Sequence, residues 1–354
     1  MPNNIVHIVG TGTIGEPLIG LLANFREPFG VDEITFHKRT PLLTDRSKVS
    51  ALAGHGAKLC VDRDSWKKFT ELGMAPCYEA EEAIKRANVV IDCTPVGNEN
   101  KDKCYDHYAS NGCGFIAQGS EFGFGKMYAY GINDPVIDPG VDKFLKVVSC
   151  NTHNLAAVID AVALGPEKED NLQEARFVCM RRANDLSEDG AFIAGPEAGK
   201  HDDRRFGTHQ ARDAHYLFKT LGLDLNIFSS ALKLNTQYMH MIHFDLLLRR
   251  PTSLENVIQR IAANPRIALT NKKSSASVFS FGRDHGLFGR ILNQTVVARQ
   301  SLALRGDREV VGTCFTPQDG NSLLSSIAAA LWFLDPGSYE ERLEALGPCF
   351  FSEI

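Results

Sequence analysis

The sequence lacks several patterns that would assign it to a specialised class of protein. No apolar run approaches the ~20 residues of a membrane-spanning helix, and the first four residues lack the charged and apolar regions of a signal peptide. The nine cysteines have no paired spacing and form no CxxC motif, and no HExxH motif or tight His/Cys cluster occurs. Internal repeats and low-complexity tracts are also missing. These absences predict a cytoplasmic protein with reduced thiols and without a membrane partner or a metal site.

Charge and length narrow the choice further. The formal net charge of −5 provides no basic field for nucleic acid, so no nucleic-acid partner is expected. A composition of 44% hydrophobic and 23% charged residues is that of an ordinary globular protein. The 354 residues exceed the roughly 100–200 of one typical domain, which favours two domains.

A glycine motif near the N-terminus predicts a dinucleotide site. Residues 4–9 have the pattern of a buried strand, and residues 16–25 have the apolar spacing of a helix. Between them, Gly10, Gly12 and Gly15 form GxGxxG in its productive context, after a strand and at the start of a helix. Gly10 permits the tight turn, Gly12 lets a pyrophosphate approach the backbone, and Gly15 allows helix and strand to pack closely.

The expected second strand, residues 33–37, ends in Lys38, Arg39 and Thr40. An NAD-specific site usually has a carboxylate here to bind the ribose 2′-hydroxyl. Two cations and a hydroxyl suit a 2′-phosphate instead, so NADP is the predicted cofactor and NAD an accepted alternative. A solvated basic turn is the other interpretation of these residues.

Further strands and helices alternate up to residue 149. The buried run 88–94 ends near Thr94 and Pro95, and ligands of doubly wound sheets gather at such strand ends. A later strand leads to Cys150, after which residues 155–162 have helical patterning. A cysteine at a strand-to-helix turn lies near free backbone N–H groups, which favour the thiolate and therefore a nucleophile. The alternative is an inert buried cysteine.

The second half predicts a different architecture. Strands are expected over 175–182, 224–233, 236–249 and in two runs within 291–316, with the second and third adjacent. Helices are expected over 208–223, 253–263 and 320–334, the last strongly apolar, and a long loop over 184–207. Several long strands with few helices favour a mostly antiparallel sheet. The predicted fold class is therefore α/β: a Rossmann domain with a doubly wound parallel sheet, followed by an α+β domain.

Around Cys150 the sequence resembles a known family. Residues 147–152 (VVSCNT) resemble the active-site segment of archaeal-type (type II) glyceraldehyde-3-phosphate dehydrogenases, whose motif is SCNTTGL. The similarity continues in order to residue 335 through short motifs at 10–15, 38–41, 92–95, 118–121, 181–185, 239–241 and 318–319. It implies a Rossmann domain over 1–149, completed by a helix over 319–335, and a catalytic domain over 150–318. A homo-oligomer, tetramer or dimer, is also implied.

The resemblance implies a reaction and its residues. A Cys150 thiolate adds to an aldehyde that carries a phosphate, a histidine accepts the hydroxyl proton, hydride passes to NADP, and inorganic phosphate releases the thioester. His240, in Met239-His240-Met241, matches the family's base and His209 is the second choice; a histidine on a strand can also be purely structural. Matches to cofactor contacts are Thr13, Ile14, Gly119, Arg182 and Gln318. Matches to substrate contacts are Ser149, Asn151, Thr152, His209 and Gln210.

The departures from the family concern the substrate. Thr-Thr-Gly becomes Thr152-His153-Asn154, and the paired histidines become His209-Gln210. Both changes lie where phosphate groups should bind, so Arg181, Arg212 and His153 are expected to rebuild an anion site. Two alternatives remain open at this point: a related dehydrogenase of another aldehyde or semialdehyde, and a catalytically inactive cofactor-binding regulator.

Overall fold

The computed structural model describes residues 4–109, 112–119, 121–185, 190–317 and 319–354. The chain forms two compact units. The first unit comprises residues 1–126, 137–147 and 323–347, and the second comprises residues 127–136, 148–322 and 348–354.

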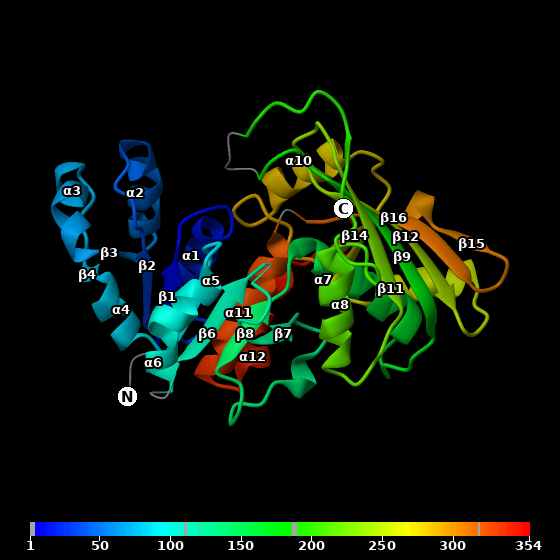
Figure 1. Cartoon of the computed structure of the whole chain (residues 1–354), viewed down its shortest axis with the longest axis horizontal. Coiled ribbons are helices and arrows are strands. Elements are labelled where there is room, and N and C mark those ends of the chain that lie inside the picture. The colour runs from blue at the N-terminus through cyan, green and yellow to red at the C-terminus, as the bar shows by residue number, and fades with distance from the viewer. Residues whose placement is uncertain (1–3, 110–111, 120, 186–189, 318) are drawn as a thin grey trace. The chain divides into compact units, whose positions relative to one another are not determined.

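The first unit is built on an eight-stranded sheet in the order β4-β3-β2-β1-β5-β6-β8-β7 (Figure 1). The strands from β4 to β8 in this order pair in parallel. Their bounds are β1 Ile5–Val9, β2 Glu33–His37, β3 Lys58–Val61, β4 Tyr78–Glu79, β5 Val89–Asp92, β6 Gly114–Gln118, β7 Lys126–Tyr128 and β8 Phe144–Val147. The central strand β1 is buried along its whole length, as expected for a sheet covered by helices. The predicted parallel sheet is confirmed.

The helices of this unit connect successive parallel strands. Their bounds are α1 Gly15–Asn24, α2 Arg46–Gly54, α3 Trp66–Glu71, α4 Ala80–Arg86, α5 Gly97–Asn100 and α6 Asp106–Ala109. The polar helix expected over 99–110 is divided, because a π-helical segment over residues 101–105 separates α5 from α6.

Helix α11 (Gly320–Leu334) has the bounds that its apolar pattern predicts. Almost every residue of its length is buried, as expected for a strongly apolar helix. Gly114 at the start of β6 shows how close the packing is, since a Cβ there would lie 2.3 Å from the ring of Phe333. Helix α12 (Tyr339–Leu343) follows, and the Arg342 guanidinium donates to the Phe29 carbonyl at 3.2 Å.

The second unit contains a mixed sheet in the order β10-β11-β9-β12-β16-β14-β13, with β15 paired to β16. The bounds are β9 Leu172–Arg181, β10 Glu197–Ala198, β11 Ile227–Lys233, β12 Met241–Leu248, β13 Ile267–Thr270, β14 Thr295–Ala298, β15 Ala303–Arg305 and β16 Glu309–Phe315. Most neighbours are antiparallel, whereas β9–β11 and β13–β14 are parallel. The predicted fold class is confirmed.

One strand prediction is wrong. Strands β11 and β12, expected to be adjacent, lie on opposite sides of β9. The chain runs from β9 through helix α8 (His209–Lys219) to β11. Because a helical crossover joins the two strands, β11 lies parallel to β9 and pairs with it. The side of β9 that remains open then pairs with β12 in antiparallel register.

Two helices pack on this sheet and position the residues discussed below. Helix α7 (Cys150–Ile159) and α8 share the largest buried cluster of the unit with Phe177 of β9 and Phe244 of β12. Small residues such as Ala156 and Ala157 let α7 approach its neighbours closely. Helices α9 (Leu254–Ala263) and α10 (Ser275–His285) complete the unit.

The last residues of the chain join the edge of the second sheet. Leu269 of β13 donates to the Ser352 carbonyl at 3.0 Å, and Ile354 donates back to Leu269 at 2.9 Å. Ile354 is buried in a cluster with Met239 and Phe315. This segment therefore covers the backbone groups that β13 would otherwise expose.

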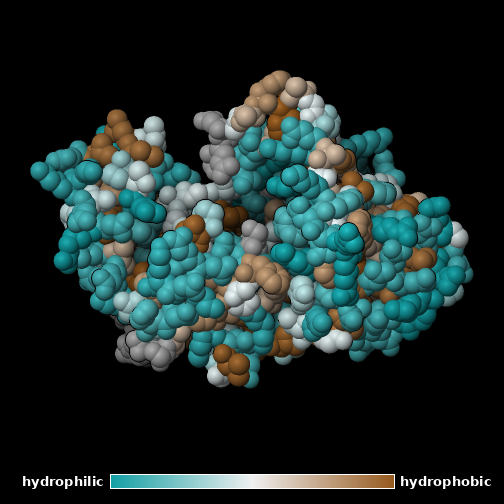
Figure 2. Space-filling model, in the orientation of Figure 1, coloured by the Kyte–Doolittle hydropathy of each residue, from teal (hydrophilic) through white to brown (hydrophobic). Residues whose placement is uncertain are grey.

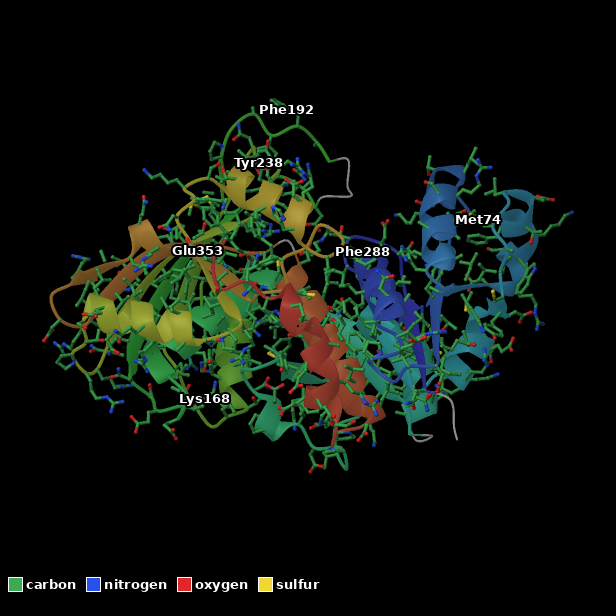
Figure 3. All side chains as sticks on the ribbon, turned by 180° about the vertical axis from the view of Figure 1, so that it is seen from behind. Met74, Lys168, Phe192, Tyr238, Phe288 and Glu353 are labelled. Carbon is green, nitrogen blue, oxygen red and sulfur yellow. The ribbon has the colours of Figure 1, made fainter. Side chains whose placement is uncertain are left out.

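The outer surface is mostly hydrophilic in the view of Figure 2. Phe192, labelled in Figure 3, is 91% exposed and stands apart in a loop. In the described part of the chain, no helix is long and apolar enough to cross a bilayer.

Candidate functional site

Cys150 is the first residue of α7, directly after β8 and the link Val148–Ser149. Ser149 has extended backbone angles and caps the helix, its hydroxyl accepting from the Thr152 N–H at 3.3 Å. The Asn321 side chain, in the first turn of α11, donates to the Cys150 carbonyl at 2.9 Å. The predicted strand-to-helix turn is therefore present, and polar contacts from two helices fix its backbone.

The electrostatic surroundings of the thiol differ from those expected at a helix N-terminus. Burial raises the pKa of Cys150, the Asp319 carboxylate raises it further, and Arg182 opposes both. Burial and the Asp319 carboxylate therefore oppose the effect of the helix N-terminus on the thiol. Asp319 occupies a left-handed backbone conformation with φ 66°, immediately before α11.

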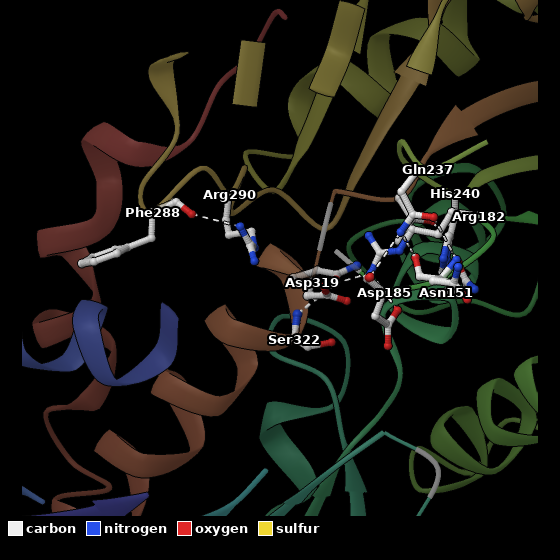
Figure 4. A network of polar contacts seen from close by, with 12 residues as sticks. Asn151, Arg182, Asp185, Gln237, His240, Phe288, Arg290, Asp319 and Ser322 are labelled. Carbon is white, nitrogen blue, oxygen red and sulfur yellow. Dashed lines mark hydrogen bonds and ion pairs between the residues drawn. The ribbon is translucent and has the colours of Figure 1, made fainter. Parts of the chain in front are cut away.

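Arg182 joins the carboxylates of this site (Figure 4). Its guanidinium is 3% exposed and lies 2.9 Å from Asp185 and 3.4 Å from Asp319. Asp185 is half exposed, whereas Asp319 is almost fully buried. One arginine between two carboxylates leaves one net negative charge beside Cys150. Among the described residues, none accepts a hydrogen bond from the buried Nε of Arg182.

His240 lies against the residue that follows Cys150. Its Nδ1 is 3.0 Å from the Asn151 side-chain oxygen, which also accepts from the Thr316 hydroxyl at 3.0 Å (Figure 4). Thr316 in turn accepts from the Asn154 amide at 2.9 Å. Because an amide oxygen only accepts, Nδ1 of His240 must carry the proton, and Nε2 then keeps its lone pair. The network assigns the tautomer that a general base requires.

The charge state of His240 agrees with that role. Burial, together with the positive charges of Arg182 and Arg181, lowers the pKa of His240 to about 3. The imidazole is therefore neutral near pH 7 and able to accept a proton. A pKa this far below the operating pH makes a weak base in the free protein, so an anionic substrate group that offsets the arginines would strengthen it.

Residues 152–154, expected to decide the substrate, lie inside the protein. Thr152, His153 and Asn154 are each fully buried. Nδ1 of His153 donates to the Ser149 carbonyl at 3.1 Å, and burial lowers the pKa of His153 to about 4. A neutral, enclosed imidazole cannot hold an anion electrostatically. The proposed part of His153 in an anion site is therefore wrong, and Asn154 instead supports the His240 network.

The remaining residues of the expected anion site share a pocket. A cavity of about 270 Å³ is lined by Arg181 at the end of β9, Lys200, and His209 and Arg212 of α8. Arg212 also pairs with Asp213 at 3.0 Å. Gln210 is buried, and its side-chain oxygen accepts from the Thr208 hydroxyl at 2.5 Å. Lys200 was not predicted as a site residue. It lies within the loop expected over 184–207, shortly after β10.

The GxGxxG segment has the geometry of a phosphate cradle. Gly10 has φ 97°, which L-residues rarely adopt, and a Cβ on Gly15 would lie 2.1 Å from the Gly10 carbonyl oxygen. Nothing lies within 4 Å of the place where a Cβ of Gly12 would be. This open backbone at the start of α1 fits a pyrophosphate, and the half-buried Thr13 and Ile14 complete the turn.

A cavity of about 650 Å³ continues from this cradle along the ends of β1, β2 and β5. Lys38, Arg39 and Thr40 line it together with Thr94. Lys38 is 8% exposed and pairs with Asp45 at 2.5 Å, whereas Arg39 and Thr40 are exposed. The residues present fit the adenosine part of a dinucleotide, with Arg39 as an exposed cation, and the carboxylates Asp62, Glu81 and Glu99 line the cavity as well.

Other expected cofactor residues are placed less directly. Thr94 donates from its hydroxyl to Asp92 at 2.6 Å, and Pro95 is exposed beside it. Gly119 has φ 70° and donates its N–H to the Val147 carbonyl. Arg182 belongs to the second unit, in the ion-pair group beside Cys150. Gln318 lies outside the described residues.

Asp185, Asp319, Thr316 and Asn321 were not predicted as site residues. Asp185 and Asp319 belong to the motifs 181–185 and 318–319 of the family resemblance, which gave the only signal for them, and each of the four is far from Cys150 in the chain. Among the described residues, no group of three or more His, Cys, Asp or Glu side chains could hold a metal ion.

Comparison with known proteins identifies relatives. No family model matches the chain. A glyceraldehyde-3-phosphate dehydrogenase of Metallosphaera sedula is 30% identical over 266 residues, which cover 71% of this chain and 72% of the relative. Enzymes of the same name from Sulfolobus acidocaldarius and Pyrobaculum calidifontis are 28% and 26% identical, over 71% and 85% of this chain and 71% and 84% of their own lengths. The chain therefore belongs to the glyceraldehyde-3-phosphate dehydrogenase family.

Proposed function

We propose that the protein is an NADP-preferring, phosphorylating aldehyde dehydrogenase that acts through a thioester on Cys150. The observation that most supports this proposal is the network through Asn151, which gives His240 an unprotonated Nε2 beside the residue that follows Cys150. Relatives named as glyceraldehyde-3-phosphate dehydrogenases support the reaction class.

In the proposed reaction the sulfur of Cys150 forms a bond to the aldehyde carbon, and the thiol proton ends on the former carbonyl oxygen. Nε2 of His240 then accepts that hydroxyl proton as the carbon loses hydride, which leaves a thioester. An oxygen of inorganic phosphate attacks the thioester carbon, and the sulfur leaves to regenerate Cys150. Bound NADP would supply the hydride acceptor.

The cofactor preference rests on the end of β2. Arg39 and Thr40 offer a guanidinium and a hydroxyl to a 2′-phosphate, and no carboxylate follows β2 directly to select a 2′-hydroxyl. Lys38 contributes less, because Asp45 already balances its charge.

The substrate proposal rests on the cationic side chains of the pocket that Arg181 lines. Asp202 and Asp203 also line it and balance the charges of Arg181 and Lys200, and Arg212 is paired with Asp213, so the pocket offers cationic donors without a net positive charge. The Arg181 charge also acts on His240, so an anion bound there would sit within electrostatic range of the base. A phosphorylated aldehyde fits this arrangement better than a neutral one. We also propose a homo-oligomer, a tetramer or a dimer, which light scattering would measure.

A panel of aldehydes tests the proposal. Glyceraldehyde 3-phosphate, unphosphorylated glyceraldehyde and succinic semialdehyde would each be assayed with NADP, with and without inorganic phosphate, by NADPH absorbance. The proposal predicts turnover that needs both a phosphorylated aldehyde and inorganic phosphate. Phosphate-independent turnover of a semialdehyde would instead establish the related dehydrogenase.

One observation favours a second candidate, a cofactor-binding regulator without catalysis. Burial and, after it, the Asp319 carboxylate raise the pKa of the Cys150 thiol, and a protonated thiol is a poor nucleophile. The two candidates differ in their response to cofactor. If the protein is an enzyme, NADP should accelerate turnover of at least one aldehyde in the panel; if it is a regulator, NADP should bind without any aldehyde being oxidised.

A further inference from the structure

A second cavity lies at the opposite end of the helix that begins at Cys150. Helix α7 continues without interruption into a π-helical segment over residues 160–164, and such segments are frequent at functional sites. The cavity there has a volume of about 380 Å³, within the range of small-molecule sites. None of the residues that line it belongs to the candidate catalytic or nucleotide sites.

The cavity combines a cationic end with apolar walls. Arg260, Arg266 and Lys168 line it, together with Ala161, Pro166 and Pro265. Two carboxylates oppose these cations. Asp160 is 5% exposed and pairs with Lys168, labelled in Figure 3, and Asp134, which accepts from the Gly131 N–H, interacts electrostatically with Arg266. Three cations against two carboxylates leave one positive charge.

The two guanidinium groups donate to backbone carbonyls, and Cζ of Arg266 lies 6.0 Å from the centroid of the Tyr130 ring. Arg260 donates to the Val162 carbonyl at 2.9 Å, and Arg266 donates to the Gly131 carbonyl at 3.1 Å. Neither forms an ion pair with a described carboxylate, and the buried Nε of Arg266 has no partner. Arginine forks without a carboxylate are suited to bind a phosphate in bidentate fashion.

The backbone around the cavity is shaped to receive these groups. Gly165 has φ 70°, and a Cβ there would lie 2.4 Å from Nη2 of Arg260. Gly131 has φ 77°, and a Cβ there would lie 2.1 Å from Nε of Arg266. Lys168, at φ 54°, adopts the left-handed conformation that non-glycine residues rarely occupy. Glycines and a strained turn thus fix all three cations around one space.

We propose that this cavity binds a small organic phosphate ester, with the dianion held by Arg260 and Arg266 and the apolar body against Ala161, Pro166 and Pro265. The proposal rests on these residues alone and does not depend on the proposed dehydrogenase activity.

Calorimetric titration of the full chain with phenyl phosphate tests the proposal, with benzoate and benzyl alcohol as comparisons. The expected result is a site for phenyl phosphate that persists in Arg181→Gln, with weaker binding of the monoanion benzoate and none of the neutral alcohol. The double variant Arg260→Gln/Arg266→Gln should bind phenyl phosphate at least about tenfold more weakly. Arg249→Gln, which removes an exposed arginine paired with Asp170, is the matched control and should bind as the unmodified protein does.

Two further variants keep the test decisive. Pro166 is exposed at the rim, so Pro166→Asp adds a negative charge without removing a buried contact and should also weaken binding. Arg181→Gln removes a cation of the pocket beside His209 and should leave the site of Arg260 and Arg266 in place, so that binding remains. The proposal is overturned if the unmodified protein does not bind phenyl phosphate at millimolar concentration, if Pro166→Asp binds normally, or if Arg181→Gln abolishes binding.

Discussion

The carboxylate of Asp319 should control the reactivity of Cys150, and replacing it by asparagine tests this directly. In the native protein Arg182 stands between Asp185 and Asp319, which leaves a net charge of −1 beside the thiol. Asp319→Asn changes that net charge to 0 and keeps the Arg182–Asp185 pair. A neighbouring charge typically shifts a pKa by about 1–3 units, so the pKa of Cys150 should fall by at least about one unit. Burial, the largest cause of the raised pKa, remains, so the thiol should stay above its ordinary value.

The rate of alkylation by iodoacetamide measures this change, because only the thiolate reacts. Below its pKa the thiolate fraction rises about tenfold for each unit by which the pKa falls, and alkylation of Asp319→Asn near pH 7 should accelerate accordingly. Peptide mass spectrometry separates Cys150 from the exposed Cys77. Arg182→Gln should slow the reaction, and Asp185→Asn should accelerate it less than Asp319→Asn does. Equal or slower alkylation of Asp319→Asn would show that Asp319 does not act on the thiol.

Three more predictions concern the base, the cofactor and stability. Thr316→Val removes one of the two donors to the Asn151 oxygen. It should lower kcat for the aldehyde about tenfold with little change in KM, whereas a comparable rise in KM would indicate a binding role. Arg39→Ala should weaken the binding of NADP about tenfold or more and that of NAD little. Lys38→Ala, which breaks the pair with Asp45, should change the ratio of the NADP and NAD affinities less. Fluorescence titration with both cofactors measures these affinities. His7, His153 and His240 have folded-state pKa values of about 3, 4 and 3, below the ordinary value near 6.5. Their contribution to the free energy of unfolding is therefore complete above pH ~6.5 and should fall by up to about 1.4 kcal/mol per histidine for each pH unit below it. Urea unfolding of His7→Asn should show a free energy of unfolding that depends less steeply on pH.

Local sequence was sufficient for the elements whose pattern is continuous. The strand Glu33–His37 and the helix Gly320–Leu334 form where their hydrophobic patterns predict, because burial of their apolar side chains determines both elements. The pairing of the strands was harder to predict from the sequence. Strands β11 and β12 have similar patterns, and only the α8 crossover determines which side of β9 each occupies. The short strand β13 and helix α10 were not predicted.

The site shows the same division. The turn that carries Cys150 is encoded locally, by a strand that leads into Ser149 and a capped helix. The pKa of the thiol is not encoded locally, because it depends on burial and on Asp319, which belongs to a segment distant in the chain. Residues 152–154 illustrate the converse: their difference from the family motif suggested a substrate contact, whereas burial assigns Asn154 to the support of Thr316. A sequence change beside a nucleophile can reflect internal packing as readily as a new substrate.

The central claim is a covalent intermediate on Cys150, and mass spectrometry of that residue tests it most directly. The protein would be mixed with glyceraldehyde 3-phosphate and NADP in the absence of inorganic phosphate, quenched in acid and digested. We predict a phosphoglyceryl thioester on the peptide that contains Cys150, formed together with NADPH, lost when inorganic phosphate is added, and missing from Cys150→Ser. NADPH formation without any adduct on Cys150, or turnover that persists in Cys150→Ser, would contradict the account.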